Sequence, residues 1–422
     1  MKRFRSFCSQ HLHDLYEAKG KANVGEMYEF ILAAATVALF TDRDTKGKPY
    51  PVDRSSVVDV MREYFAGKKN WTVEVGRGGR DLVELEASGV VGLSLTAVQN
   101  ALPLLDRDIG NEDLDLIAGW KPKSLFKTIE DLIATSIDAV NRNKTLKDLS
   151  TQVITNGEED DVVVKCVGTS GAMKTKSDID VYVNDVELRS IGISVKLETV
   201  KQVDQAAGVD AVANLKTIFD RFGIPYGSND FNGVKDAMDP KKGFVGVYTD
   251  RSPSKDKNVG SDKRKVFDAV MASFNKVASS LISRGFFKKE PAVKTLMQGL
   301  RVAATKGEAD VEVIKGRMSY DQNTFNMLSK GVVAAANGNN VSAKAELSSA
   351  RGDREPNPSI GFYAGLPGQE QIKIFKLRFR FDADRKGDVY NVRFRFLVEL
   401  EDISDFLDQL ENAAPSRGIS RR

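Results

Sequence analysis

Residues 161–205 constrain the fold most strongly, because an apolar β-branched segment in this stretch is followed by two segments that alternate between apolar and polar side chains. The β-branched run at 162–167 is typical of a buried strand, and the small residues at 168–171 end it. Residues 178–184 alternate with a period of two, and residues 191–197 repeat the pattern. We therefore expect three short strands, of which the second and third each have one apolar face.

The second and third segments each place polar or charged side chains on one face. Asp178 and Asp180 alternate on one segment, and Ser194 and Lys196 alternate on the next. Two aspartates on one strand face repel each other, and a divalent cation would offset that repulsion. Mg²⁺ or Mn²⁺ is commonly held by carboxylates together with substrate phosphates, and a nearby lysine stabilises charge on phosphate. The alternative is an ordinary solvated sheet face.

The order of these motifs resembles the PD-(D/E)XK nuclease superfamily. A strand is followed by a glycine-bearing loop, then by Asp178, a short hairpin and the sequence Ile193-Ser194-Val195-Lys196. The resemblance implies a restriction-endonuclease-like fold and Mg²⁺-dependent hydrolysis of phosphodiester bonds. It also implies that Asp178 binds the metal ion and that Lys196 is the motif lysine.

The sequence departs from this family at Ser194, where the family usually has Glu, Asp or sometimes Gln. Some restriction-enzyme branches with Ser-x-Lys take a glutamate from an upstream helix instead. Glu26 and Glu29 lie three residues apart near the start of an apolar helical segment, so they share a helix face. They are our leading candidates to complete the acidic set, ahead of Glu198. Asp180 is a candidate second metal ligand, and Ser194 could hydrogen-bond a metal-bound water. Acidic residues are also common at helix starts without any ligand role.

A second resemblance is to nucleotidyltransferases, which carry a glycine loop before an Asp-x-Asp strand. The Gly-Thr-Ser sequence at 168–170 would then hold a triphosphate, and Asp178 and Asp180 would bind metal ions. The third carboxylate of that family has no clear counterpart, because the next strand presents Ser194 and Lys196. A catalytically inactive DNA-binding protein of the nuclease fold is a third hypothesis, motivated by Ser194.

Clustered cations and amides suggest where DNA could bind. The net charge of +3 does not by itself indicate a nucleic-acid-binding protein, so any such surface needs local segregation of charge. Like charges crowded on one hairpin face repel, and a polyanion relieves this, although acidic neighbours would do the same. The candidates are Lys174 and Lys176 in the glycine loop; Lys201, Gln202 and Gln205 at the start of a helix expected over 206–222; Arg77 and Arg80 at the tip of a β-hairpin over 71–86; and Arg378, Arg380, Arg393 and Arg395 on one face of a second hairpin over 371–400.

Composition excludes several other classes. The chain has 422 residues, of which 41% are hydrophobic and 29% charged, as in soluble globular proteins. Cys8 and Cys166 are the two cysteines, and His11 and His13 are the two histidines. This set gives no sign of a disulfide framework, a zinc site or a Ser-His-Asp triad.

The expected fold is α/β (α+β), with a restriction-endonuclease-like mixed sheet flanked by helices, helical insertions and a C-terminal β-hairpin. Residues 251–265 and 336–360 are expected to be polar loops. The expected regions are 1–150, mainly helical with a basic β-hairpin; 151–250, the nuclease core; 251–345, helical; and 346–422, a basic β-hairpin and tail.

We therefore expect a Mg²⁺-dependent DNA endonuclease of restriction type or encoded by a phage. Double-stranded DNA is the expected partner, a homodimer is compatible with the sequence, and no membrane partner is expected. The basic N-terminus is not followed by an apolar signal region, and the apolar segment 31–40 is short for a bilayer span. A cytoplasmic location, in a bacterial or phage-infected cell, is expected.

Overall fold

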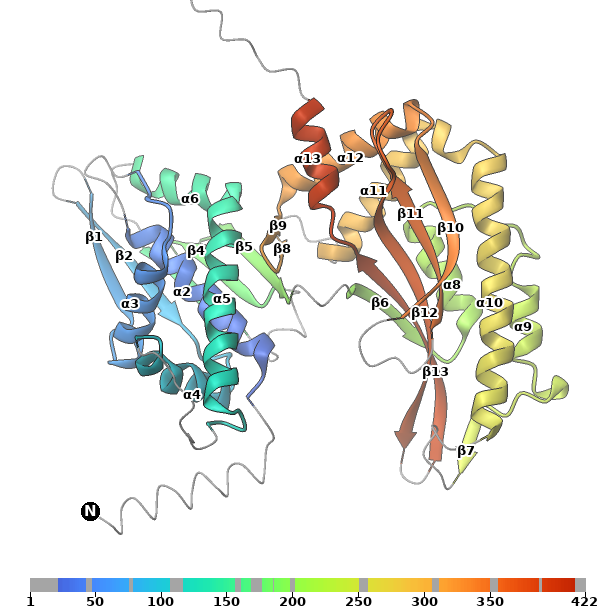
Figure 1. Cartoon of the computed structure of the whole chain (residues 1–422), viewed down its shortest axis with the longest axis horizontal. Coiled ribbons are helices and arrows are strands. Elements are labelled where there is room, and N and C mark those ends of the chain that lie inside the picture. The colour runs from blue at the N-terminus through green and yellow to red at the C-terminus, as the bar shows by residue number, and fades with distance from the viewer. Residues whose placement is uncertain are drawn as a thin grey trace, which may run out of the picture. The chain divides into compact units, whose positions relative to one another are not determined.

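The computed structural model describes residues 22–42, 48–75, 79–106, 117–155, 161–167, 177–184, 186–197, 202–249, 257–305, 311–349, 356–386 and 389–413. The chain is an α+β protein that folds into two compact units (Figure 1). Unit 1 comprises Met1–Val200 and Glu308–Asn323, and unit 2 comprises Lys201–Gly307 and Thr324–Arg422. The four regions expected from the sequence are grouped differently, because the basic hairpin near the N-terminus and the motif strands belong to one unit.

Unit 1 is built on a mixed sheet in the order β1-β2-β3-β4-β5-β8-β9. β2 pairs with β3 and β5 pairs with β8 in parallel, whereas the other neighbours are antiparallel. The expected hairpin and the three expected motif strands are all present. The strands are β1 (Asn70–Val75), β2 (Gly79–Glu86), β3 (Asp161–Cys166), β4 (Ile179–Val183), β5 (Val186–Lys196), β8 (Val311–Lys315) and β9 (Met318–Tyr320).

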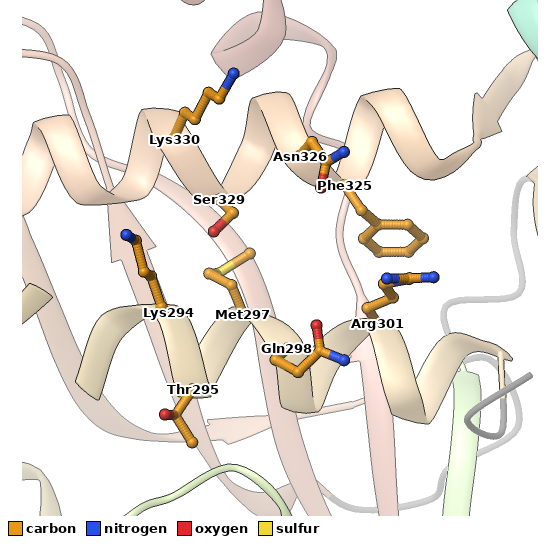
Figure 2. A pocket seen from close by; sticks show the side chains of 9 residues that line it. All are labelled: Lys294, Thr295, Met297, Gln298, Arg301, Phe325, Asn326, Ser329 and Lys330. Carbon is orange, nitrogen blue, oxygen red and sulfur yellow. The ribbon is translucent and has the colours of Figure 1, made fainter. Parts of the chain in front are cut away.

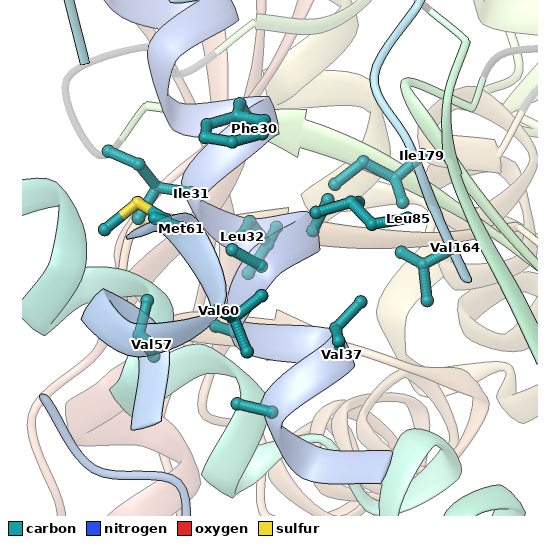
Figure 3. Packing of buried hydrophobic residues seen from close by; sticks show 14 of the residues in the cluster. Phe30, Ile31, Leu32, Val37, Val57, Val60, Met61, Leu85, Val164 and Ile179 are labelled. Atoms are coloured by element: carbon teal, nitrogen blue, oxygen red, sulfur yellow. The ribbon is translucent and has the colours of Figure 1, made fainter. Parts of the chain in front are cut away.

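Helix α2 (Val24–Thr41) forms the centre of the unit 1 core. Its N-terminus is capped by Asn23, whose side chain accepts a hydrogen bond from the Gly25 amide. Apolar side chains of α2 such as Phe30 and Ile31 pack with those of α3 and of the sheet strands (Figure 3). The other helices are α3 (Arg54–Phe65), α4 (Gly92–Ala101), η1 (Leu102–Leu104), α5 (Pro122–Arg142) and α6 (Lys144–Thr155).

The length and composition of α2 would also suit a membrane span. However, 72% of its apolar window is buried inside the protein, as in the core helix of a soluble protein. Each fully buried Phe, Leu or Ile side chain contributes about 1.5–3 kcal/mol to folding, so the burial of α2 accounts for its apolar sequence. This is consistent with a soluble protein.

Unit 2 contains an antiparallel sheet in the order β10-β11-β12-β13-β6, and β7 pairs with β13. The long hairpin expected over 371–400 is present as β12 and β13. Phe379 lies opposite Phe396, and Phe381 lies opposite Phe394, on the apolar face. The strands are β6 (Gln202–Gly208), β7 (Val247–Thr249), β10 (Val341–Ser348), β11 (Asn357–Ala364), β12 (Ile372–Lys386) and β13 (Val389–Leu400).

The helices of unit 2 include two that pack against this sheet. α8 contacts β6 and β13, and α10 contacts β10 and β11. The bounds are α8 (Ala211–Arg221), α9 (Asn232–Ala237), η2 (Pro240–Lys242), α10 (Lys257–Ser283), η3 (Phe286–Lys288), α11 (Glu290–Thr305), α12 (Gln322–Asn337) and α13 (Ser404–Ala413).

Three expectations for unit 2 need correction. The helix expected over 206–222 begins at Ala211, because residues up to Gly208 pair with β13 as strand β6. Residues 257–265, expected in a polar loop, belong to α10. Residues 341–348 and 357–360, expected in a polar loop, belong to β10 and β11. In each case pairing or packing with distant segments outweighs the local composition.

Candidate active site

Asp178 lies immediately before β4, where its side chain bridges to β5. Its backbone amide donates to the Ile193 carbonyl at 2.7 Å, which continues the pairing of the two strands. Its Oδ2 atom accepts a hydrogen bond from the Val195 amide at 2.6 Å and lies 3.4 Å from the Ser194 hydroxyl oxygen. The carboxylate is therefore held in a fixed position at the end of β5.

Lys196, the last residue of β5, completes this contact. Its Nζ atom lies 3.3 Å from Oδ2 of Asp178 and donates to the Val195 carbonyl at 2.8 Å. The side chains of Lys196 and Asp178 are 25% and 23% exposed, so a substrate could reach both of them. The two motif residues that the sequence assigned to separate strands are thus in contact.

Glu29, on helix α2, is a third charged residue of this site. The pKa of Glu29 is raised from 4.5 to about 8, mainly by burial and then by the negative charges of Asp178 and Glu26, whereas Lys196 opposes the shift. These interactions need the four charged groups to lie close together. The structure therefore gathers Glu26 and Glu29 with the two motif residues, although 149 positions separate Glu29 from Asp178 (178 − 29).

Glu26 is positioned by a residue that the sequence did not identify. The Ser94 hydroxyl, on α4, donates to Oε2 of Glu26 at 2.6 Å and accepts from the Asn23 amide at 3.1 Å. Ser94 is 1% exposed. No motif in the sequence marks Ser94, because its role depends on the packing of α4 against α2.

A second connection joins α2 to the end of β5. The Tyr28 hydroxyl donates to the Gly316 carbonyl at 2.7 Å, and the Gly316 amide donates to the Lys196 carbonyl at 2.9 Å. Gly316 lies in the turn between β8 and β9 with φ of 56°, a left-handed conformation that favours glycine. This turn fixes the helix that carries Glu29 against the strand that carries Lys196.

The donor set suits a hard divalent cation. Within the described ranges, no group of three or more His, Cys, Asp or Glu residues forms a closed metal site. Mg²⁺ does not need such a site, because one or two carboxylates with waters and substrate phosphates usually hold it. After burial, the negative charges of Asp178 and Glu26 also raise the pKa of Glu29, and a cation held by these carboxylates would offset that repulsion.

The structure does not bring Asp180 to this group. Oδ2 of Asp180 accepts from the Tyr182 hydroxyl at 3.0 Å, and the charge of Asp180 acts on Lys165 of β3. Asp180 is not among the charges that shift Glu29. These contacts lend no support to the expectation that Asp180 is a second metal ligand, and Glu198 lies outside the described residues.

The expected DNA contacts near the motif are placed only in part. Arg77, Lys174, Lys176 and Lys201 lie outside the described residues, and only the backbone of Arg80 is described, on β2. Gln202 and Gln205 lie on β6 and not at a helix start, which corrects that expectation. Their side-chain amides hydrogen-bond to each other at 3.2 Å.

The basic face expected on the C-terminal hairpin is neutralised by acidic residues. Arg378 is 3% exposed and pairs with Glu399 at 2.6 Å, so it does not present a free charge at the surface. Arg380 and Arg395 both pair with Asp382, at 3.0 and 2.9 Å. The buried Lys376 contacts Glu399 and Glu401 in the same way. Arg393 is exposed and lies opposite Asp382 in the strand register.

Comparison of the chain with protein-family models, with curated proteins and with solved structures found no match. Any functional assignment therefore depends on the residues of this chain and on how they are arranged.

Proposed function

We propose that this protein is a Mg²⁺-dependent nuclease that hydrolyses phosphodiester bonds in DNA. One observation carries the proposal: Lys196 at the end of β5 contacts Asp178 before β4 at 3.3 Å, and both charges act on Glu29 of α2. The fold has no evident structural need for these three charged residues, which lie far apart in the sequence, to interact. Burying Glu29 against two other carboxylates costs stability, which a functional requirement would explain.

The residues of the site divide into carboxylates and a lysine. Asp178 and Glu29 would hold Mg²⁺ or Mn²⁺, with Glu26 as the further carboxylate near them. When bound, the cation would make an attacking water more acidic and would neutralise charge on the phosphate. This arrangement matches the superfamily resemblance, in which a glutamate from a helix before the core strands replaces the acid missing at Ser194.

Lys196 would act on the scissile phosphate. Its ammonium group is held by Asp178 and by the Val195 carbonyl, so little reorganisation is needed for it to stabilise negative charge that develops there. Ser194 is fully buried, and its hydroxyl donates to Oδ2 of Asp178 at 3.4 Å. Ser194 would therefore orient the carboxylate, and a direct contact with a metal-bound water is not supported.

The nucleotidyltransferase alternative has less support. It needs Asp178 and Asp180 to bind metal ions together, but Asp180 is bonded to Tyr182 and acts on Lys165. The Gly-Thr-Ser loop at 168–170 lies outside the described residues. An inactive DNA-binding protein stays an alternative that the cleavage experiment decides.

The test is cleavage of supercoiled and linear DNA with Mg²⁺ or Mn²⁺. Lys196→Ala and Asp178→Asn are compared with two matched variants of the same sheet, Lys165→Ala and Asp180→Asn. We expect cleavage by the native protein, loss of at least about 100-fold in the first pair, and near-native rates in the second, because only the first pair would touch metal or phosphate.

Three outcomes would contradict the proposal. Native protein that binds DNA and leaves it intact with both metals would favour the inactive DNA-binding alternative. Incorporation of labelled nucleotide, lost in Asp180→Asn, would favour a nucleotidyltransferase. Cleavage that persists in Lys196→Ala and in Asp178→Asn would place the active site elsewhere.

A further inference from the structure

Helices α11 and α12 of unit 2 enclose a groove with a volume of about 570 Å³ (Figure 2). Met297 and Phe325, each at most 5% exposed, form its apolar floor. The other lining residues are polar or cationic: Lys294, Thr295, Gln298 and Arg301 on α11, and Asn326, Ser329 and Lys330 on α12. The volume lies within the range of about 300–1,000 Å³ that is usual for ligand sites.

The groove is strongly biased towards anions. Its lining contains three cations and, among the described residues, no acidic side chain. Arg301 and Lys330 have no acidic partner in the described part of the chain. Lys294 pairs with Glu290 at 2.7 Å, but both side chains are about half exposed, so this pair contributes little and can exchange for a phosphate.

The neutral groups add hydrogen-bonding capacity. Figure 2 shows Ser329 directed from α12 towards α11, and Phe325 and Arg301 directed towards each other across the groove. The side chains of Gln298, Asn326 and Ser329 have no hydrogen-bond partner among the described residues. Amides and hydroxyls of this kind contact phosphate and sugar oxygens in nucleic-acid complexes.

The spacing of the cations suits a repeating polyanion better than a single anion. Lys294 and Arg301 are seven residues apart on α11. At a rise of about 1.5 Å per residue this is about 10 Å along the helix, which matches about three phosphates of one strand spaced about 3.4 Å apart along the axis of the duplex. Lys330 on α12 also lines the groove, and Figure 2 shows its side chain directed away from α11.

We propose that the α11–α12 groove binds the sugar-phosphate backbone of DNA. This inference rests on the proposed function, because it adds a substrate-binding surface in unit 2 to the cleavage site in unit 1. The groove would hold DNA without reading its sequence, since phosphate contacts position a protein on DNA but carry no base information.

The experiment measures binding of a labelled DNA duplex by fluorescence anisotropy, in EDTA, over about 50–200 mM salt. The full-length native protein is compared with Arg301→Gln/Lys330→Gln and with the control Lys216→Gln/Lys265→Gln. The control removes two exposed lysines of α8 and α10 that have no acidic partner among the described residues. The groove variant and the control variant each lose two positive charges, so they differ from the native protein by the same amount. Thermal unfolding checks that all three proteins are folded.

We expect the groove variant to lower the slope of log K against log salt by about 2, because each lost phosphate contact removes about 0.9. At about 0.1 M salt this is a loss of roughly eightfold in affinity for each cation, and roughly sixtyfold for both. The control should retain both the slope and the affinity.

The outcomes separate this inference from the proposed function. A folded groove variant with native slope and affinity would overturn the groove assignment, while cleavage lost in Lys196→Ala would still support the nuclease. If the native protein neither binds nor cleaves DNA, both fail. If the groove variant bound poly-glutamate more weakly than the native protein does but bound DNA equally well, the groove would be assigned to an acidic protein. That result would overturn the DNA assignment.

Discussion

The hydroxyl of Ser94 lies 2.6 Å from Oε2 of Glu26, and this contact joins two helices across 68 positions of sequence. Ser94 also accepts from the amide of Asn23, the residue that caps α2. One buried serine thus fixes both the start of α2 and the carboxylate beside Glu29. It acts on the site through Glu26 and is a positioning residue.

Ser94→Ala is expected to weaken the binding of Mn²⁺ by about 10–100-fold, as the loss of a residue that orients a ligand commonly does. Thr96→Ala is the matched control, because the Thr96 hydroxyl, also on α4, bonds to the Gly92 carbonyl of its own helix and to no other described residue. Calorimetric titration of each variant with Mn²⁺ measures the effect. Equal affinities for the two variants would remove Ser94 from the site.

The faces of individual strands could be predicted from the sequence, but what covers each face could not. Alternation placed Lys376, Arg378 and Arg380 on one side of β12, and that placement is consistent with their contacts. Their acidic partners Glu399 and Asp382 occupy alternate positions in the same two strands. The cations on this face therefore need no polyanion to balance them. Counting the acidic residues in the same two strands would have indicated this from the sequence.

The candidate site was predictable to the extent that its motif is local. Asp178 and Lys196 follow from strand alternation and from the resemblance, and the structure brings them together. The interaction of Glu29 with them depends on the packing of α2 on the sheet, which no local pattern encodes. Ser94 could not be found from the sequence for the same reason, and β6 was misassigned because its partner β13 lies almost 200 residues away.

Metal binding should become stronger as the pH rises through the pKa of Glu29, because a cation must displace the proton. Glu29 is protonated up to about pH 8 in the folded protein and up to about 4.5 when exposed. Without metal, the stability that the proton on Glu29 contributes is complete below pH 4.5 and is lost as the pH rises to about 8. Added Mn²⁺ restores stability in the upper part of this range.

Thermal unfolding with and without Mn²⁺, at about pH 6.5 and about pH 8.5, measures this dependence. Saturation at about 100 times the dissociation constant would stabilise the fold by about 2.7 kcal/mol at the higher pH, and by less at the lower pH. Glu29→Gln should remove the difference between the two pH values. A cation effect that does not change with pH in the native protein would exclude Glu29 as a ligand.

Glu312, on β8, gives unit 1 a second dependence on pH. It is 6% exposed, and the Asn143 side-chain amide donates to its Oε2 atom at 2.8 Å. Burial raises its pKa from 4.5 to about 7 despite the hydrogen bonds from Thr145 and Asn143, and the charge of Asp321 adds to the increase. The stability due to its bound proton is complete below 4.5 and is lost as the pH rises to about 7.

Glu312→Gln should therefore flatten the stability of the protein between about pH 5 and pH 7.5, with a gain of up to about 3 kcal/mol at the upper end. Gln keeps an oxygen that can accept from Asn143 and carries no charge. Urea unfolding over this pH range measures the free energy. Parallel curves for the native protein and the variant would show that Glu312 does not titrate there.

Arg378 is expected to stabilise unit 2 and not to bind DNA. Arg378→Met leaves Glu399 with only its longer contact to Lys376, at 3.3 Å, and should cost about 3–5 kcal/mol, because a buried carboxylate loses its main partner. Arg378→Met/Glu399→Leu should recover part of this loss, since Lys376 keeps its contact with Glu401. The exposed control Arg393→Met should cost about 1 kcal/mol or less. Chemical unfolding measures these stabilities, and a stable Arg378→Met with a reduced salt dependence of DNA binding would return Arg378 to the DNA-binding surface.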